Sequence, residues 1–357
     1  MSAFRASAPG KAVLLGEYAV LSGTPALVMA VNRRAYAEVR RCGRQTSSVA
    51  VPQLGFGPVP FRLGPGGTVE WLDETAGHSA FQRARATLEW QLARRADRLA
   101  EGGGLEIRID TSELYQSTSC GLVKLGLGSS AAMSVSLVAA LEALLDPAPA
   151  GLLWARLQDE LLQPYRSTQG GRGSGIDLAA SLHGGVSRYE LGPDGPLIQQ
   201  LHLPEELRLA FVWTGQAAST ADFLHRFDAW RTREIQAAKV ILHEMDRCCR
   251  RALGYLNQSD SAGVMTCINN YRQTMGKIGI GAGLPVISSS LQAIADVAVG
   301  YELACKPCGA GGGDIAMLAG VSPRALDEAC SVLAEQGWPS LSLDLAEQGL
   351  LIEKISD

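Results

Sequence analysis

Residues 124–133, KLGLGSSAAM, have the composition of a phosphate-binding loop. Gly126, Gly128 and Ser129 are small enough for several backbone N–H groups to point into one concavity. The apolar run that follows, residues 134–141, predicts a helix whose positive N-terminal end faces the same concavity. The stretch therefore predicts a site that binds phosphate groups.

Three charged residues stand where a catalytic site could be assembled. Lys11 and Glu17 flank a short predicted strand, residues 12–15, and Asp177 opens a predicted helix after the glycine-rich segment 169–175. A lysine beside phosphates stabilises developing negative charge, and a carboxylate can accept a proton or orient a metal. Each residue also has a plainer interpretation, the first two as surface residues and Asp177 as a helix N-cap.

A second glycine cluster lies near the end of the chain, in KPCGAGGGD at residues 306–314. Four glycines with only Ala310 among them indicate backbone that closely approaches a ligand or another loop. We expect this loop to join a helix to the apolar strand predicted at residues 315–318. Cys305 and Cys308 have the spacing of a redox or zinc motif, but no second such pair or nearby histidine completes a four-ligand site.

The composition is that of a globular protein with room for two lobes. The chain has 357 residues, of which 46% are hydrophobic and 19% charged, and its net charge is −4. This length buries a large core, and the acidic balance argues against a nucleic-acid partner. Because no stretch has the length of a membrane span or a signal-peptide core, we expect a cytoplasmic protein without a membrane partner. The eight cysteines are scattered, as is typical of buried thiols.

Hydrophobic periodicity and turn residues predict a β-rich opening and a helical second half. The predicted strands are 12–15, 26–31, 35–40, 48–51, 59–63, 69–72, 105–110, 207–212, 315–318, 340–345 and 350–352. The predicted helices are 78–100, 134–141, 154–162, 177–182, 221–256, 262–276, 289–298 and 323–336. We expect Pro164 to end the helix before it, and residues 111–123 to form a loop.

Taken together, these motifs resemble the three signatures of the GHMP kinase superfamily, which includes galactokinases, homoserine kinases, mevalonate kinases and phosphomevalonate kinases. The likeness extends over nearly the whole chain, and the motifs follow the family's order. The P-loop pattern and the dinucleotide fingerprint are both missing from the sequence. The resemblance implies an α+β fold of two lobes with the site between them. An N-terminal ATP-binding lobe, residues 1–200, would contain a left-handed β-α-β crossover, and residues 201–357 would form a ferredoxin-like lobe.

Within the superfamily the details resemble the phosphomevalonate kinases. WTGQAAST at residues 213–220 is similar to their W-T-G-x-P-A-S-T, and residues 306–314 are similar to their K-P-S-G-A-G-G-G-D. Ala217 and Cys308 replace the usual proline and serine, and Tyr18 follows Glu17 where most other members have histidine. The implied activity is ATP-dependent conversion of phosphomevalonate to diphosphomevalonate in isoprenoid biosynthesis. The departures leave three alternatives: a kinase for mevalonate, a kinase for a sugar or sugar phosphate, and a non-catalytic homologue that binds a small molecule.

The resemblance also implies a role for each site residue. The catalytic residues would be Lys11 and Asp177. The residues that wrap the ATP phosphates would be Lys124, Gly126, Leu127, Gly128, Ser129, Ser130 and Ala131, with the Ser130 hydroxyl on Mg²⁺. The acceptor would contact Glu17, Arg172, Ser174, Thr214, Ser219, Thr220, Lys306, Gly309, Gly311 and Gly312.

The charges in these motifs bear on the acceptor. An alcohol must lose a proton to a base such as Asp177, whereas a phosphate monoester is already ionised at neutral pH, and Asp177 would then chiefly orient the lysine or the metal. Two polyanions brought together require extra cations, for which Lys124, Arg172 and Lys306 are available, and this favours a phosphorylated acceptor. Residues 165–175 contain no acidic side chain, although mevalonate kinases place a second Mg²⁺ ligand there. The remaining metal ligands and the choice between a monomer and a homodimer stay open.

Overall fold

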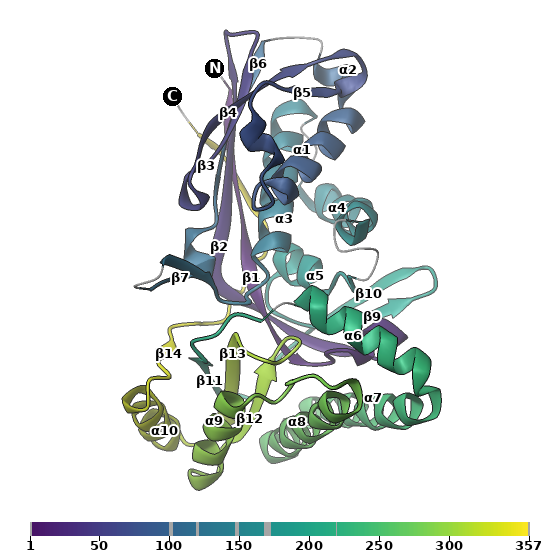
Figure 1. Cartoon of the computed structure of the whole chain (residues 1–357), viewed down its shortest axis with the longest axis vertical. Helices are drawn as coiled ribbons and strands as arrows, with labels where there is room; N and C mark the ends of the chain where they lie inside the picture. Colours follow the sequence, from purple (N-terminus) through teal and green to yellow (C-terminus); the bar gives the residue numbers. More distant parts are fainter. Residues whose placement is uncertain are drawn as a thin grey trace.

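The structure is a computed structural model that describes residues 2–99, 103–118, 121–146, 150–167, 173–218 and 220–355. It has two parts, a large sheet flanked by helices and a smaller sheet with helices of its own (Figure 1). The strands are β1 (Ala3–Leu15), β2 (Ala26–Cys42), β3 (Ser47–Val51), β4 (Phe56–Leu63), β5 (Val69–Trp71), β6 (Gly104–Asp110), β7 (Tyr115–Thr118), β8 (Gly121–Lys124), β9 (Val186–Gly192), β10 (Gly195–Leu201), β11 (Arg208–Trp213), β12 (Ala304–Cys308), β13 (Ile315–Gly320), β14 (Ser340–Leu341) and β15 (Leu351–Ile355). The α-helices are α1 (Gln82–Arg94), α2 (Ala96–Leu99), α3 (Ser129–Leu145), α4 (Ala150–Ser167), α5 (Ile176–His183), α6 (Thr220–Arg233), α7 (Ile235–Asn257), α8 (Ser261–Ala282), α9 (Ser289–Gly300) and α10 (Pro323–Glu335).

β1 and β2 form the centre of the large sheet. The strand order is β10-β9-β2-β6-β3-β4-β5, and β1 pairs with the other edge of β2. The pairings are antiparallel except that of β3 with β6. The sequence predicts separate strands at 26–31 and 35–40, and the break between them is wrong because β2 continues through residues 32–34. The extra residues are accommodated by a register shift between Pro9 and Gly10 of β1. One long strand pair therefore reaches from the outer end of the sheet to its junction with the second sheet.

The last strand returns to the first sheet. β15 pairs with the outer edge of β1, with Ala3 opposite Ile355, so both ends of the described chain lie side by side (Figure 1). We keep the division into lobes after residue 200 as a proposal, because β10 ends at Leu201 and β11 begins the second sheet. We add β15 to the first lobe, because it completes the first sheet.

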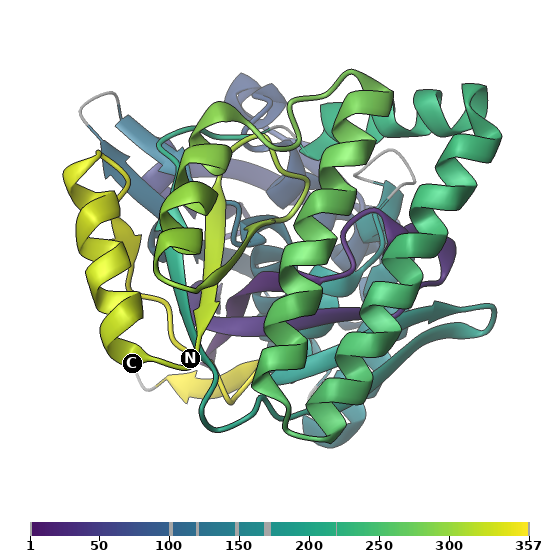
Figure 2. The ribbon, with the colours of Figure 1, turned by 90° about the horizontal axis from the view of Figure 1, so that it is seen from below.

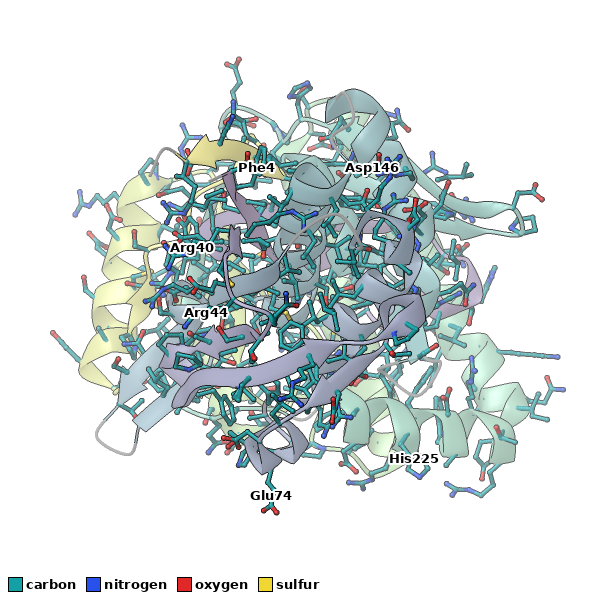
Figure 3. All side chains as sticks on the ribbon, turned by 90° about the horizontal axis from the view of Figure 1, so that it is seen from above. Phe4, Arg40, Arg44, Glu74, Asp146 and His225 are labelled. Atoms are coloured by element: carbon teal, nitrogen blue, oxygen red, sulfur yellow. The ribbon has the colours of Figure 1, made fainter. Side chains whose placement is uncertain are left out.

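One face of the large sheet carries ion pairs instead of helices. Along β2, Ala37 and Val39 are buried, and the side chains between and beside them are polar. Glu106 on β6 accepts hydrogen bonds from Arg40 and Arg44, which lie close together in Figure 3. These pairs are largely exposed, so they contribute little to stability.

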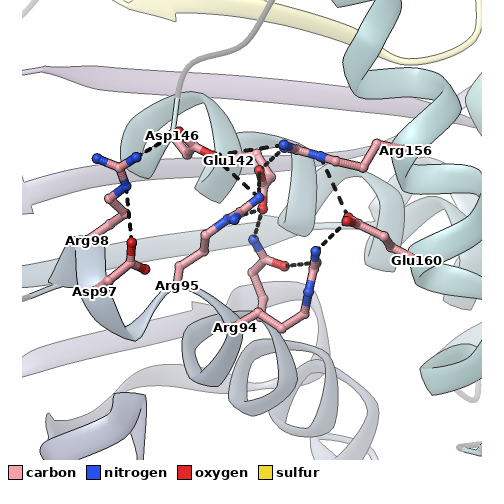
Figure 4. Close-up of polar contacts among 9 residues, drawn as sticks. Arg94, Arg95, Asp97, Arg98, Glu142, Asp146, Arg156 and Glu160 are labelled. Atoms are coloured by element: carbon pink, nitrogen blue, oxygen red, sulfur yellow. Dashed lines mark hydrogen bonds and ion pairs between the residues drawn. The ribbon is translucent and has the colours of Figure 1, made fainter.

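α3 packs against β1 and β2 on the other face and is buried along almost its whole length. Its alanine, valine and leucine residues surround the helix, as expected where no side meets water. The exception is Glu142 in the last turn, which is fully buried. Arg95 binds its two carboxylate oxygens at 2.8 and 2.7 Å, and Arg156 of α4 and Gln91 of α1 also donate to it (Figure 4). This cluster fixes the end of α3 opposite the glycine loop.

We predict that Glu142→Ala lowers the free energy of unfolding by about 3 kcal/mol, because it leaves two arginines without their buried partner. Urea denaturation followed by circular dichroism measures the change. The matched control is Glu328→Ala, which breaks an exposed pair with Arg324 on α10 and should leave the free energy of unfolding nearly unchanged. Equal losses in the two variants would contradict a stabilising role for the buried cluster.

The second sheet has the order β12-β13-β11-β14 and is antiparallel. Figure 2 shows α7 and α8 side by side as the two long helices of this part. The single helix predicted over residues 221–256 is broken at Glu234 into α6 and α7. The loop at residues 309–314 joins two strands, β12 and β13, and the prediction that it follows a helix is wrong because Ala304–Cys308 are strand. Cys305 and Cys308 are buried free thiols on β12.

Two predictions near the site are corrected. Residues 115–118 and 121–124 pair as the antiparallel strands β7 and β8 where a loop is expected, since the sequence lacks strand alternation there. Pro164 does not end α4, which continues to Ser167. The buried side chains of Leu161, Leu162 and Tyr165 hold the last turn against the core although proline removes one backbone hydrogen bond. No helix in the described ranges is both long and apolar enough to cross a membrane.

Candidate active site

A cleft of about 720 Å³ lies where the two glycine loops meet. A smaller cavity of about 360 Å³ adjoins it and shares Arg83, Lys124, Ser129 and Ser130 with it. Most of the predicted site residues line the cleft: Lys11, Glu17, Lys124, Gly126, Gly128, Ser129, Ser130, Ser174, Asp177, Thr220 and Gly309. Predicted Arg172 and Ser219 lie outside the described residues. The motifs that the sequence separates by up to 300 residues therefore converge on one space.

The first glycine loop is tied to β1. The backbone N–H of Lys11 donates to the Leu127 carbonyl at 2.8 Å, and its ammonium group donates to the Gly126 carbonyl at 3.0 Å. A Cβ atom on Gly10 would lie 2.6 Å from the Leu127 carbonyl oxygen, so only glycine allows this approach. Leu127 and Ala131 are buried, so they shape the loop and present only backbone to a ligand. The loop is a rigid cradle at the N-terminus of α3.

Gly128 separates Lys11 from Asp177. A Cβ atom at this position would lie 3.0 Å from Lys11 Cγ and 3.6 Å from Asp177 Cβ. Both residues line the cleft, and no ion pair joins them among the interactions of the described residues. The N-cap of α5 is Gly175, which shows that the plainer interpretation of Asp177 as a cap is wrong. Tyr165, which the sequence did not single out, donates its hydroxyl to Asp177 Oδ2 and fixes the carboxylate.

Lys306 does not reach the cleft. It is fully buried, and its ammonium group donates to Glu17 Oε1 at 2.5 Å and to the carbonyls of Val13 and Pro307 at 3.2 and 2.6 Å. The prediction that Lys306 contacts the acceptor is therefore wrong, because its three hydrogen bonds are used inside the core. Glu17 also accepts the Gly309 N–H at 3.1 Å.

Glu17 is buried, so the interpretation of this residue as a surface glutamate is wrong. Its second oxygen, Oε2, is buried without a hydrogen-bond partner, and the residue lines the cleft. A buried carboxylate oxygen without a donor is costly, so it is suited to accept a hydrogen bond from a bound molecule. The contact between Glu17 and the acceptor stays a prediction, and Oε2 is the atom expected to make it.

Three other predicted residues build the walls of the site without lining it. The Thr214 hydroxyl is buried and donates to the Asp314 carbonyl at 3.0 Å. A Cβ atom on Gly311 would lie 2.3 Å from the Val286 carbonyl oxygen, and one on Gly312 would lie 2.3 Å from the Phe223 ring. Thr214 and Gly311 are buried and Gly312 is partly buried, and their contacts with the acceptor stay predictions.

The structure adds two charged residues to the cleft. Arg83 on α1 lines both cavities, and Asp314 at the end of the second glycine loop lies against Gly126. Desolvation in the cleft lowers the pKa of Lys124 and the charge of Arg83 lowers it further, whereas Asp314 opposes this. Burial raises the pKa of Asp314 against the opposing effects of the Ala218 N–H and the lysine charges. Arg83 has no sequence signal beyond its place on an amphipathic helix.

The donors present suit a metal that is held partly by a ligand. No group of three histidine, cysteine, aspartate or glutamate side chains able to hold a metal occurs in the described part of the chain. Mg²⁺ is commonly bound by one or two protein oxygens together with phosphate oxygens, so an incomplete protein shell is compatible with it. The Ser130 hydroxyl and the Asp177 carboxylate, both lining the cleft, fit that donor set.

Comparisons with known proteins support this geometry. Residues 86–185 match the family model of the GHMP kinases N terminal domain. The solved structure of Streptococcus pneumoniae phosphomevalonate kinase in complex with phosphomevalonate and AMPPNP matches 99% of this chain and 100% of that one, with a TM-score of 0.73 at 17% identity. The chain is therefore similar to the GHMP kinases in sequence over residues 86–185 and in fold over nearly its whole length. The expected two-lobed α+β fold of these kinases is confirmed.

Two relatives match over nearly the whole chain. A phosphomevalonate kinase of Streptomyces sp. (strain CL190) is 28% identical over 375 residues, covering 96% of this chain and 97% of that protein. A mevalonate kinase of Thermococcus gammatolerans is 27% identical over 369 residues, covering 98% of each. The chain is therefore similar, over nearly its whole length, to two kinases that are named for different acceptors.

We predict that Lys306→Met lowers the free energy of unfolding by about 3 kcal/mol, because Glu17 is left as an uncompensated buried charge. Adding Glu17→Gln should recover part of the loss, which a double-mutant cycle in urea measures. Lys277→Met is the matched control, since its pair with Glu244 is exposed and should contribute less than about 1 kcal/mol. Additive losses in the double variant would refute the pairing.

Proposed function

We propose that this protein is a GHMP kinase that transfers the γ-phosphoryl group of ATP to phosphomevalonate and forms diphosphomevalonate for isoprenoid synthesis. The observation that carries the proposal is the convergence of the glycine loop, Lys11 and Asp177 on one cleft. Similarity to a phosphomevalonate kinase over 96% of the chain supports the choice of acceptor.

The smaller cavity is suited to the nucleoside of ATP. Its walls include the apolar side chains of Val51, Leu54, Ile109 and Met133, against which a purine can pack. Ser129 and Ser130 lie at its junction with the larger cleft, beside the N-terminus of α3. A nucleotide placed this way has its phosphates on the backbone N–H groups of the loop and its terminal phosphate in the larger cleft.

Phosphoryl transfer depends on position and charge. Mg²⁺ bound by Ser130 and the phosphates would neutralise part of the charge on the transferred group. Lys11, fixed to the loop through Gly126, would stabilise the negative charge that develops in the transition state. Asp177, held by Tyr165, would orient the acceptor or the metal, since a phosphate monoester is ionised at neutral pH without a base.

The acceptor would occupy the part of the cleft lined by Val20, Leu21 and Leu224, which do not line the smaller cavity. These side chains supply apolar surface for a methyl-bearing carbon chain. Ser174 and the free oxygen of Glu17 supply polar partners for a hydroxyl group and other polar atoms.

Three cations were expected to bind the extra negative charge of a phosphorylated acceptor. Lys124 lines the cleft and Lys306 lies in the core, whereas Arg172 is outside the described residues. Of these three, only Lys124 is therefore seen where it could bind the acceptor. The preference for phosphomevalonate over mevalonate or a sugar phosphate therefore depends chiefly on the similarity to phosphomevalonate kinase and on the WTGQAAST and KPCGAGGGD motifs.

A coupled ADP-release assay with phosphomevalonate, mevalonate, sugars and sugar phosphates tests the proposal. We expect turnover with phosphomevalonate, and turnover with a sugar alone would overturn it. Lys11→Ala should lower the turnover by at least about 100-fold, because a charge aimed at the transferred phosphoryl group is lost. The control is Lys239→Ala, an exposed lysine on α7, which should retain full activity.

The pH dependence distinguishes the two roles of Asp177. We predict that turnover falls as the pH drops below about 6, because the acceptor phosphate takes up a proton with a pKa near 6. Because the substrate takes up this proton, the fall in turnover at acidic pH, the acidic limb of the profile, does not depend on Asp177. Asp177→Asn should therefore lower kcat by about tenfold and leave the acidic limb in place. Loss of the limb in the variant would show that Asp177 acts as a general base.

A further inference from the structure

Asp314 occupies an unusual position, because it places a negative charge beside a loop suited to bind phosphate. Its backbone is in the left-handed region, with a φ of 55°, which is unfavourable for a non-glycine residue. The surrounding turn offsets this cost. The Asp314 N–H donates to the Gln216 carbonyl at 2.6 Å, and its carbonyl accepts from the N–H and the hydroxyl of Thr214, both at 3.0 Å.

The carboxylate contacts two separate segments that line the cleft. Asp314 Oδ1 accepts the backbone N–H of Ala218 at 3.1 Å, in the turn that leads to the acceptor side. A Cβ atom on Gly126 would lie 2.6 Å from Asp314 Oδ2, so the other oxygen touches the phosphate loop. Only a glycine at position 126 leaves room for this contact, which links the two lobes.

The same carboxylate lies in the field of the two lysines that serve the phosphates. The charges of Lys11 and Lys124 both lower the pKa of Asp314, and the three side chains line one cleft. A unit negative charge near the loop reduces the positive potential that an arriving triphosphate meets. Asp314 therefore opposes the attraction that the lysines and the helix N-terminus provide.

We propose that Asp314 is a positioning residue with two separable effects: its oxygen holds the turn at Ala218 for the acceptor, and its charge weakens nucleotide binding at the phosphate loop. The inference rests on the proposed function, in that the loop binds nucleotide phosphates. Weaker binding speeds the departure of ADP, and product release limits turnover in many enzymes.

Two substitutions separate the effects. Asp314→Asn removes the charge and keeps an oxygen that accepts the Ala218 N–H, whereas Asp314→Ala removes both. Calorimetry with ADP and with a non-hydrolysable ATP analogue should show about tenfold tighter binding in Asp314→Asn, since one opposing charge is gone. With the acceptor that the ADP-release assay identifies, Asp314→Ala should raise the acceptor KM about tenfold over that of Asp314→Asn, because the turn loses its hydrogen bond.

The control is Glu302→Gln, which removes an exposed carboxylate from a residue that also has a left-handed backbone and lies outside the cleft. It should leave nucleotide affinity within about twofold of the parent value. Unchanged or weaker nucleotide binding in Asp314→Asn would show that the charge of Asp314 does not weaken nucleotide binding. Equal acceptor KM values in the two Asp314 variants would show that its oxygen does not hold the turn at Ala218 for the acceptor. Calorimetry requires no acceptor, so failure of the phosphomevalonate assay leaves the nucleotide result decisive.

Discussion

The attachment of the phosphate loop to β1 is the constraint on which the rest of the site depends. Lys11 binds the loop twice, through its backbone N–H to Leu127 and through its ammonium group to Gly126. Each hydrogen bond is worth only about 1 kcal/mol in net stability, but together they place the lysine and the N-terminus of α3 on the same space. Gly10 makes the attachment possible, since any side chain there would collide with the loop.

The second lobe is held to this centre by groups buried at the end of β1. Glu17 pairs with Lys306 on β12 and accepts the Gly309 N–H, and the Tyr271 hydroxyl on α8 donates to the Glu17 carbonyl. The Tyr18 hydroxyl donates to Ala310 at 2.5 Å. The loop of the second sheet is therefore fixed by residues of the first, so the two walls of the cleft keep their relative positions. A buried ion pair that adds little net stability can still specify such an arrangement, and we infer that Lys306 serves this purpose.

Sequence reasoning predicted the parts of the site that depend on local chemistry. Glycines in 126–128 and the apolar run behind them require a loop and a helix N-terminus, and Lys11 and Asp177 follow from the family resemblance. Burial could not be inferred, because nothing local distinguishes a lysine that faces a ligand from Lys306, whose partner lies 289 positions away.

The site residues that sequence reasoning missed depend on contacts between distant segments. Tyr165 was overlooked because a proline at position 164 was expected to end the helix, whereas tertiary packing carries α4 past it. The proximity of Asp314 to Gly126 exists only once both lobes are folded. The long strands and the overall class were predictable from alternation, but the strand pair β7–β8 and the return of β15 to the first sheet depend on pairing between separate segments.

A crystal structure with a non-hydrolysable ATP analogue tests the central claim most directly. We expect the triphosphate to contact the backbone N–H groups at the start of α3, beside Lys11, and the base to lie in the smaller cavity near Leu54 and Met133. A nucleotide bound elsewhere, for example in the arginine-lined groove on the open face of the large sheet, would contradict it.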